Sequence, residues 1–287
     1  MATLREIRRR IGSVKSTQQI TRAMKMVASA KLRQAQDKIM AARPYARKID
    51  EMIQHLLTHS PDLTDPLLQS RETQRVTLVA VTADRGLCGA FNSNIIRRTL
   101  QQIEQHKDKE VELVCVGRKG YEFFNKRGYR IAGHFVRFFN NLEYGHALQI
   151  TDYLVERYRS GATDRIEVVY NEFKNAAQQN LVVEKYLPLR SEGFETESYG
   201  IDYLYEPDQE ALLNAILPKH LNMQTWRILL ESFAAEQGAR MTAMENATDN
   251  AEEMIHNLTL HYNRARQATI TKEISEIVGG AEALKSA

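Results

Sequence analysis

A glycine-rich segment near the middle of the chain is the first place where residue types and spacing could support chemistry. It reads Thr82-Ala-Asp-Arg-Gly-Leu-Cys-Gly-Ala-Phe-Asn92 and lies between an apolar, β-rich stretch and a helical pattern. Proteins of the α/β class often bind phosphates at such a junction. The phosphate-loop pattern needs Gly-Lys-Ser/Thr after four intervening residues, and neither it nor the dinucleotide fingerprint fits this segment. The spacing therefore favours a tight turn of glycines, and we expect no nucleotide or other cofactor site.

The other reactive side chains do not form a catalytic set. Cys88 lies close to a helix start, but a nucleophile also needs a positioned base, and no Cys/His signature is present. Asp84, Glu206 and Asp208 form no recognisable acid/base pair, and the eight histidines are scattered without ligand spacing. We therefore expect no catalytic residue and no metal site. A small α/β enzyme that uses Cys88 stays open as an alternative.

The segments around the glycine-rich loop alternate between strand-like and helix-like patterns. Strands are expected at 75–81, 111–117, near 130–135, 165–170 and 181–187, and helices at 93–106, 119–126 and about 142–159. This alternation predicts a small, largely parallel, Rossmann-like α/β domain, which we assign to residues 61–205. Within it, residues 191–200 are expected to form a loop.

Residues 1–60 follow a seven-residue repeat typical of a coiled-coil helix. Its two alternating series are Leu4, Ile11, Gln18, Lys25, Leu32, Ile39, Ala46 and Ile53, and Ile7, Val14, Thr21, Ala28, Ala35, Ala42, Ile49 and Leu56. Gln18, Thr21 and Lys25 interrupt the apolar pattern, so the seam there is expected to be polar or to face something else. Pro44 should kink the helix or mark a joint. A helix of some 55 residues extends roughly 80 Å, which is unusual for a globular protein.

Residues 206–287 provide a partner for this helix. Apolar and small residues at spacings of three and four predict a helix from about Leu221 to Val278, ended by Gly279-Gly280. Residues 1–60 carry 13 Lys/Arg and 4 Asp/Glu, a net charge of +9, whereas residues 205–287 carry 7 and 12, a net charge of −5. Opposite charges suggest that the two segments pair with each other as a long antiparallel coiled coil.

The basic N-terminal helix could instead bind nucleic acid through phosphate contacts. Its persistent apolar seam and the lack of any aromatic residue before Tyr45 favour a protein partner. Apolar stretches such as Leu78 to Val81 are far too short to cross a bilayer, so membrane association is expected only through a partner. We see no export signal, and two cysteines, Cys88 and Cys115, suit a reducing cytoplasm.

Four blocks, in the right order over nearly the whole length, resemble the gamma-subunit family of F-type ATP synthases. The N-terminal block is Ile7-Arg-Arg-Arg-Ile-Gly-Ser-Val-Lys-Ser-Thr-Gln-Gln-Ile-Thr-Arg-Ala-Met-Lys-Met-Val-Ala28, and the glycine-rich segment is the second. Asp202-Tyr-Leu-Tyr-Glu-Pro-Asp208 is the third. The C-terminal block comprises Glu236-Gln-Gly-Ala-Arg-Met-Thr-Ala-Met-Glu-Asn-Ala-Thr-Asp-Asn250 and Tyr262-Asn-Arg-Ala-Arg-Gln-Ala-Thr-Ile-Thr-Lys-Glu-Ile-Ser-Glu-Ile-Val-Gly-Gly280.

The resemblance implies a rotating, non-catalytic shaft. The coiled coil would be inserted in a hexamer of alternating alpha and beta subunits, with the α/β domain at its base near the epsilon subunit and the c-ring. Nucleotides would belong to alpha and beta, and the membrane would be reached only through the c-ring, at the cytoplasmic face of a bacterial plasma membrane. A coiled-coil adaptor with an α/β head for some other partner is the alternative. No cysteine-bearing insert occurs near residues 200–240, so redox control is not expected.

The same resemblance assigns contact residues. Those expected to meet the beta subunits are Met24, Lys25, Arg266, Gln267 and Thr271. Those expected on the side of the c-ring and epsilon are Tyr203, Tyr205, Glu206 and Asp208. Without the resemblance, local roles would be the simpler interpretation: seam packing for Met24, a solvated charge for Arg266, and core positions for the tyrosines.

Overall fold

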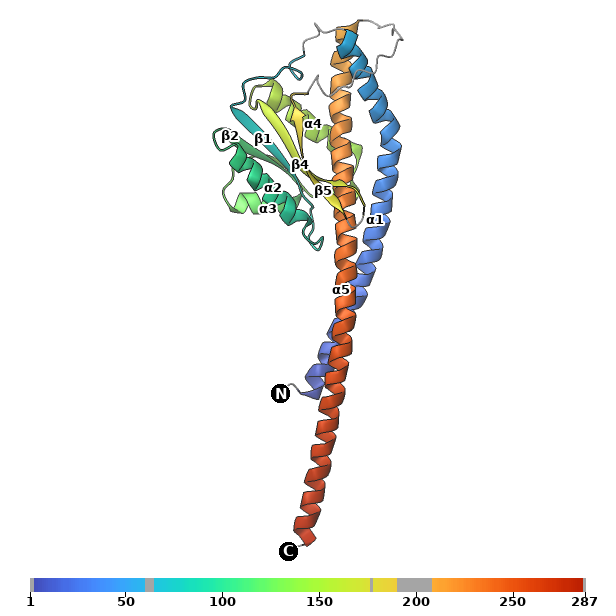
Figure 1. The fold of residues 1–287 in the computed structure, drawn as a ribbon. Helices are drawn as coiled ribbons and strands as arrows, with labels where there is room; N and C mark the ends of the chain where they lie inside the picture. Colours follow the sequence, from blue (N-terminus) through green and yellow to red (C-terminus); the bar gives the residue numbers. More distant parts are fainter. Residues whose placement is uncertain (1–2, 60–64, 176–177, 190–207, 286–287) are drawn as a thin grey trace. The chain divides into compact units, whose positions relative to one another are not determined.

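Two long helices run through both units of this chain. The computed structural model describes residues 3–59, 65–175, 178–189 and 208–285. Unit 1 consists of Met1–Val27 with Met241–Ala287, and unit 2 consists of Ala28–Arg240. Helix α1 (Leu4–His59) and helix α5 (Gln209–Lys285) each contribute residues to both units (Figure 1).

Unit 2 is built on a five-stranded mixed sheet. Its strands lie in the order β3-β2-β1-β4-β5, and β5 alone is antiparallel to its neighbour. The strands are β1 (Arg75–Val81), β2 (Glu110–Val116), β3 (Ile131–Phe135), β4 (Arg165–Phe173) and β5 (Gln179–Leu187). The intervening helices are α2 (Phe91–Gln105), α3 (Arg118–Lys126), the short 3-10 helix η1 (Phe139–Asn141) and α4 (Tyr144–Arg159).

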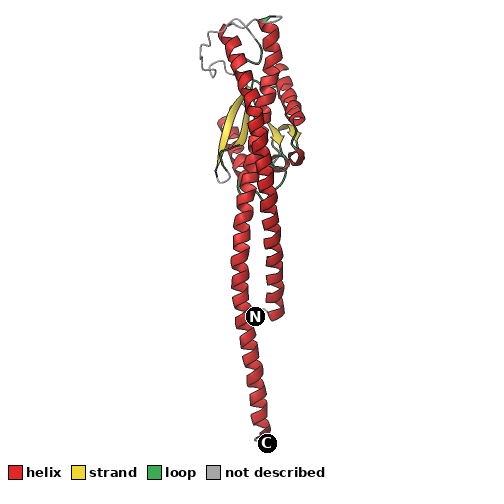
Figure 2. Ribbon diagram, turned by 90° about the vertical axis from the view of Figure 1, so that its right-hand side faces the viewer, coloured by secondary structure: helices red, strands yellow, loops and turns green. Residues whose placement is uncertain are grey.

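The two faces of this sheet bury different helices. On one face, alternate residues of the parallel strands, such as Leu78 and Leu113, pack with Phe91 and Ile95 of α2 and with Phe124 of α3. On the other face, the remaining alternate residues pack with α4 and with the parts of α1 and α5 that belong to unit 2. Figure 2 shows those two helical segments side by side against the strands. Burial on both faces explains why the parallel strands are nearly continuous apolar runs.

Helix α5 begins earlier and ends later than the sequence predicts. It starts at Gln209 rather than near Leu221, continues through Pro218, and passes Gly279 and Gly280 to reach Lys285. A proline inside a helix costs about 3 kcal/mol, and each glycine costs about 1 kcal/mol. Around Pro218 the cost is offset by buried leucines on the same helix, namely Leu213, Leu217 and Leu221. Likewise, α1 does not end at Pro44.

The fold class predicted from the sequence is confirmed. Two long terminal helices accompany a central Rossmann-like domain of alternating strands and helices. Strand β1 has the predicted bounds, and β4 and β5 extend beyond them by three and two residues, respectively. The expected loop at 191–200 lies outside the described residues.

Candidate functional site

In unit 1, the start of α1 pairs with the second half of α5. Thr21 Oγ1 lies 2.7 Å from Thr248 Oγ1, and Lys25 Nζ lies 2.6 Å from Glu245 Oε1. Residue numbers rise along α1 while they fall along α5, so the pair is antiparallel. Thr21 and Lys25, which interrupt the apolar heptad pattern, therefore make polar contacts between the two helices. Because Lys25 and Glu245 are both partly exposed, their ion pair contributes less than about 1 kcal/mol.

An apolar stripe on α1 contains the predicted contact residue Met24. Ile20 and Val27 are 57% and 56% exposed, and Met24, at intermediate exposure, lies between them at helical spacing. The three side chains therefore share one face of α1. Exposed apolar residues clustered in this way are typical of an interaction surface.

The end of α5 presents an amphipathic surface that contains the other three predicted beta-subunit contacts. Arg266, Gln267 and Thr271 are exposed. At spacings of three and four they share a face with four aliphatic residues that are 46–71% exposed: Ile270, Ile274, Ile277 and Val278. The opposite face carries polar and charged residues, including the exposed Lys272–Glu276 pair at 3.6 Å. We refer to the seven residues of the first face as the α5 terminal face.

Asp208 begins α5. Its Oδ1 accepts a hydrogen bond of 2.7 Å from the backbone N–H of Ala211, which is the geometry of a helix N-cap. Asp208 is exposed. The remaining residues predicted on the c-ring side, Tyr203, Tyr205 and Glu206, lie outside the described residues.

The glycine-rich segment is organised around the buried carboxylate of Asp84. Asp84 Oδ1 accepts hydrogen bonds from the backbone N–H groups of Arg118 at 3.0 Å and Arg137 at 2.8 Å, and Oδ2 accepts one from Phe139 at 3.2 Å. Arg118 is the first residue of α3, where α/β proteins often hold a phosphate. The protein's own carboxylate therefore takes the donors that a phosphate would use.

Cys88 does not have the environment of a nucleophile. Its side chain is 2% exposed, and Asn92 Nδ2 donates to its Sγ at 3.3 Å. Burial raises the pKa of Cys88, and the nearby Arg240 guanidinium only partly offsets this effect. An activated cysteine needs the opposite shift.

A buried ion pair on α5 holds the glycine-rich segment, and sequence reasoning missed it. Arg240 Nη1 lies 2.6 Å from Glu236 Oε1, and Arg240 Nη2 donates to the carbonyl of Gly86 at 3.2 Å. Both residues are less than 9% exposed, and burial raises the pKa of Glu236 against the lowering effect of Arg240. The available signal was the spacing of two opposite charges, four residues apart, in a helix stretch of small and apolar residues.

Within the described ranges, no group of side chains could hold a metal ion. No helix among these residues is long and apolar enough to span a bilayer.

Comparison with known proteins identifies the family. A family model described as ATP synthase matches residues 3–284. An ATP synthase gamma chain from Prosthecochloris aestuarii is 51% identical over 291 residues, covering 99% of each chain. Another, from Chloroherpeton thalassium, is 50% identical over 301 residues and also covers 99% of each chain. The chain belongs to the ATP synthase gamma-chain family. Its members in this comparison match it from end to end.

Solved structures share the fold. A chain from the mitochondrial ATP synthase of Euglena gracilis, solved with OSCP, F1 and c-ring, superposes with a TM-score of 0.68 at 23% identity, covering 98% of this chain and 94% of that one. A chain from the central stalk and c-ring of the Tetrahymena thermophila enzyme gives a TM-score of 0.62 at 26% identity, covering 79% and 99%.

As a gamma chain, the protein is the rotor shaft of an F-type ATP synthase and a non-catalytic subunit of that complex. The buried, high-pKa Cys88 agrees with this conclusion, since a cysteine enzyme would need an accessible thiolate.

Proposed function

We propose that this shaft couples proton-driven rotation of a membrane c-ring to conformational change in the catalytic beta subunits. ATP is made in one direction of rotation and hydrolysed in the other. The observation that carries the proposal is the α5 terminal face, where three predicted beta-subunit contacts share one helix face with exposed aliphatic residues. A face of this composition is suited to an apolar protein surface that surrounds it.

Two parts of the helix pair are proposed to meet the alpha and beta subunits. Arg266, Gln267 and Thr271 contact a loop of beta, while the neighbouring aliphatic residues pack against the hexamer. Met24 and Lys25 face the part of beta that moves during turnover, and the stripe with Ile20 and Val27 supports an apolar contact there. Lys25 keeps part of its surface exposed although it is paired with Glu245, so it can reach a second carboxylate.

Asymmetry of the shaft explains how rotation can drive chemistry elsewhere. A single helix pair cannot make the same contacts with three surrounding beta subunits at once. Each beta subunit is therefore biased toward a different conformation, because the shaft binds those conformations with different free energies. Rotation moves the bias from one beta subunit to the next.

The residues that precede α5, namely Tyr203, Tyr205, Glu206 and Asp208, are proposed to contact the epsilon subunit and the c-ring. In this arrangement residues 1–60 and 206–287 form the shaft, and residues 61–205 form its base. The protein would be peripheral, at the cytoplasmic face of a bacterial plasma membrane, and would reach the membrane only through the c-ring.

Reconstitution tests the proposal. The full chain is mixed with separately purified alpha and beta subunits, gel filtration reports the stoichiometry, and an ATPase assay compares turnover with and without the chain. We expect one copy to join each hexamer, to change turnover, and to lose that effect when residues 266–287 are removed. A stable complex with no change in turnover would indicate an adaptor instead. Failure to join the hexamer, or ATPase activity from this chain alone, would contradict the proposal.

A further inference from the structure

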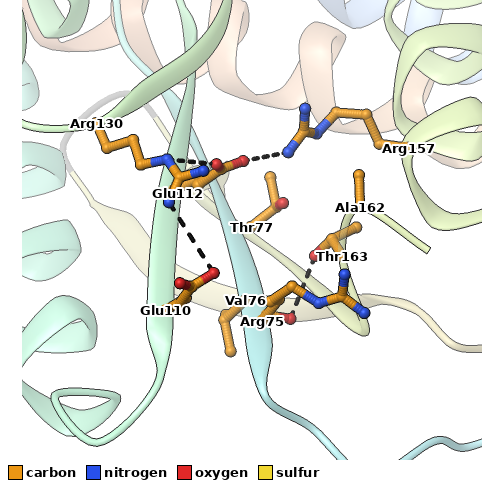
Figure 3. A pocket seen from close by; sticks show the side chains of 9 residues that line it. All are labelled: Arg75, Val76, Thr77, Glu110, Glu112, Arg130, Arg157, Ala162 and Thr163. Atoms are coloured by element: carbon orange, nitrogen blue, oxygen red, sulfur yellow. Dashed lines mark hydrogen bonds and ion pairs between the residues drawn. The ribbon is translucent and has the colours of Figure 1, made fainter. Parts of the chain in front are cut away.

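A polar cavity of ≈ 360 Å³ lies beside the first residues of β1 and β2 in unit 2. The end of α4 and the turn that follows it close the other side (Figure 3). Its lining residues are Arg75, Val76, Thr77, Glu110, Glu112, Arg130, Arg157, Ala162 and Thr163. The cavity is therefore at the amino ends of the parallel strands, at the opposite end from the glycine-rich segment.

The carboxylates in this cavity are already paired. The side chain of Glu112 is 16% exposed. Its Oε1 accepts from Arg130 Nε at 2.6 Å, and its Oε2 accepts from Arg157 Nη2. Glu110 lies 4.0 Å from Arg130. The third arginine of the lining, Arg75, is held outside it by Asp164, with Nη2 3.0 Å from Oδ1, so the three guanidinium groups are matched by three carboxylates.

Two buried polar atoms in the cavity have no hydrogen-bond partner among the described residues. They are Oγ1 of Thr77, a residue that is 1% exposed, and Nε of Arg157. Figure 3 shows Thr77 in the middle of the lining residues. A buried donor without an acceptor destabilises the fold, so such atoms mark places where a partner binds.

We propose that this cavity binds a small oxyanion, a phosphate or carboxylate group. Its oxygens would accept hydrogen bonds from the Thr77 hydroxyl and from Arg157 Nε. Guanidinium groups suit this ligand because their planar array of donors matches two oxygens at once. Glu112 does not repel the anion strongly because two arginines neutralise it. A metal ion fits poorly, because both carboxylates of the lining are already paired with arginines.

The site goes beyond the rotor function and does not depend on it. None of its lining residues is among the predicted subunit contacts, and all of them belong to unit 2. A bound oxyanion would link β1 to the end of α4. Since it would bind only the folded state, it would also raise the unfolding temperature.

Calorimetric titration of the full chain with inorganic phosphate, and separately with acetate, tests the proposal. The buffer is kept at low ionic strength because salt screens such contacts. We expect saturable binding of one anion per chain, weakened about tenfold or more by Arg157→Gln and at least about threefold by Thr77→Val. The matched control Arg159→Gln, an exposed arginine on the same helix outside the cavity, should bind like the unmodified chain.

The two titrations separate the sources of the anion. Stronger binding of phosphate assigns the site to a phosphate group, and stronger binding of acetate assigns it to a carboxylate. Thr77→Val keeps the shape and the β-propensity of the residue, so it remains informative if Arg157→Gln does not fold. No saturable binding of either anion, or equal binding by Thr77→Val and by the control, would overturn the proposal.

Discussion

Asp84 fills with its own carboxylate the position where many α/β proteins hold a phosphate. Three backbone N–H groups, from Arg118, Arg137 and Phe139, donate to its two oxygens. The sequence excluded a phosphate loop between β1 and α2 from the missing Gly-Lys pattern, and at the neighbouring start of α3 the chain's own carboxylate binds the backbone donors. The donors are satisfied from within the chain.

Replacing Asp84 by Asn should therefore destabilise unit 2. An amide offers one acceptor oxygen, so its NH₂ group would face a backbone donor that the carboxylate now satisfies. We expect the free energy of unfolding to fall by about 1–3 kcal/mol. Urea denaturation measures the change. Asp108→Asn, at an exposed position, should change the unfolding free energy by less than roughly 0.5 kcal/mol, and equal effects of the two substitutions would contradict the assigned role.

Asp164 makes the stability of unit 2 depend on pH. Its carboxylate accepts from the backbone N–H groups of Gln74 at 3.2 Å and Arg75 at 2.9 Å, and it also bonds the Arg75 guanidinium. Burial alone would raise the pKa of Asp164, but these bonds outweigh it and lower the pKa below its ordinary value. The folded state then binds the proton less tightly than the unfolded state. Its stabilisation is fully present above the unfolded pKa of about 4 and is lost as the pH falls through the folded value.

Asp164→Asn should thus cost about 1–3 kcal/mol at pH 7, and the difference from the unmodified chain should shrink as the pH falls below about 4. Urea denaturation at several pH values gives the free energy of unfolding of the variant and of the unmodified chain as a function of pH. Asp152→Asn, an exposed position on α4, serves as the control and should give a small difference at every pH. A cost for Asp164→Asn that stays constant down to low pH would show that its charge is not the cause.

At the scale of the elements, the turn from β2 into α3 is fixed by close contact between two backbones. Gly117 has φ +92°, and a Cβ added there would lie 2.0 Å from the carbonyl oxygen of Thr82 at the end of β1. Gly128 also has a positive φ, +73°, but a Cβ there would meet nothing within 4 Å. Substitution of Gly128 would introduce only the strain of a positive φ, whereas substitution of Gly117 would add a steric overlap to that strain.

Gly117→Ala should cost roughly 3 kcal/mol or more, because both strain and overlap with immovable backbone oppose it. Gly128→Ala should cost only about 1 kcal/mol from the strain of a positive φ. Thermal denaturation of the two variants measures the difference. Similar costs would mean that Thr82 and α3 can move apart, contrary to the hydrogen bond of 2.9 Å that the Gly120 N–H of α3 donates to Thr82 Oγ1.

Sequence patterns located the elements because the patterns are local. The apolar run at 75–81 is bounded by polar residues, and β1 has those bounds. The start of α5 was wrong because Pro218 is a local stop signal, while the burial of Leu213 and Leu217 that outweighs it is a tertiary effect. The bonds of Asp84 and the contact of Arg240 with Gly86 join residues far apart in the chain. A single sequence carries no signal for such contacts.

At the scale of the whole molecule, both units depend on helices that the two chain ends supply. The charge difference between the terminal segments correctly predicted that they pair, and Lys25 with Glu245 is one such contact. Four of the five predicted beta-subunit contacts lie on two exposed surfaces, Met24 on the Ile20–Val27 stripe and the others on the α5 terminal face, whereas Lys25 is paired with Glu245. If these surfaces contact the alpha and beta subunits as we propose, substitutions there should affect assembly more than folding.

A double substitution on the α5 terminal face tests whether this surface contributes to assembly and not to folding. Ile274→Asp with Ile277→Asp should leave the unfolding free energy of the isolated chain within roughly 0.5 kcal/mol, because both side chains are more than half exposed. It should weaken entry into the alpha–beta hexamer about tenfold or more, because two charges would have to be buried. Gel filtration and ATPase assays measure entry.

The matched control is Lys272→Ala with Glu276→Ala on the opposite helix face, where the pair is exposed and weak. It should assemble like the unmodified chain. Equal loss of assembly in both double variants would indicate that the helix end as a whole matters, rather than its apolar face.

The composition of unit 1 has a consequence for synthesis on the ribosome. Unit 1 joins the first residues of the chain to those from Met241 onward, whereas unit 2 is one continuous stretch, Ala28–Arg240. A growing chain can therefore fold unit 2 before Thr248 and Glu245, the partners of Thr21 and Lys25, have left the ribosome. Residues 4–27 are translated before unit 2 but are among the last to find their contacts. A stretch with exposed Ile20, Met26 and Val27 is where we expect a nascent-chain chaperone to act.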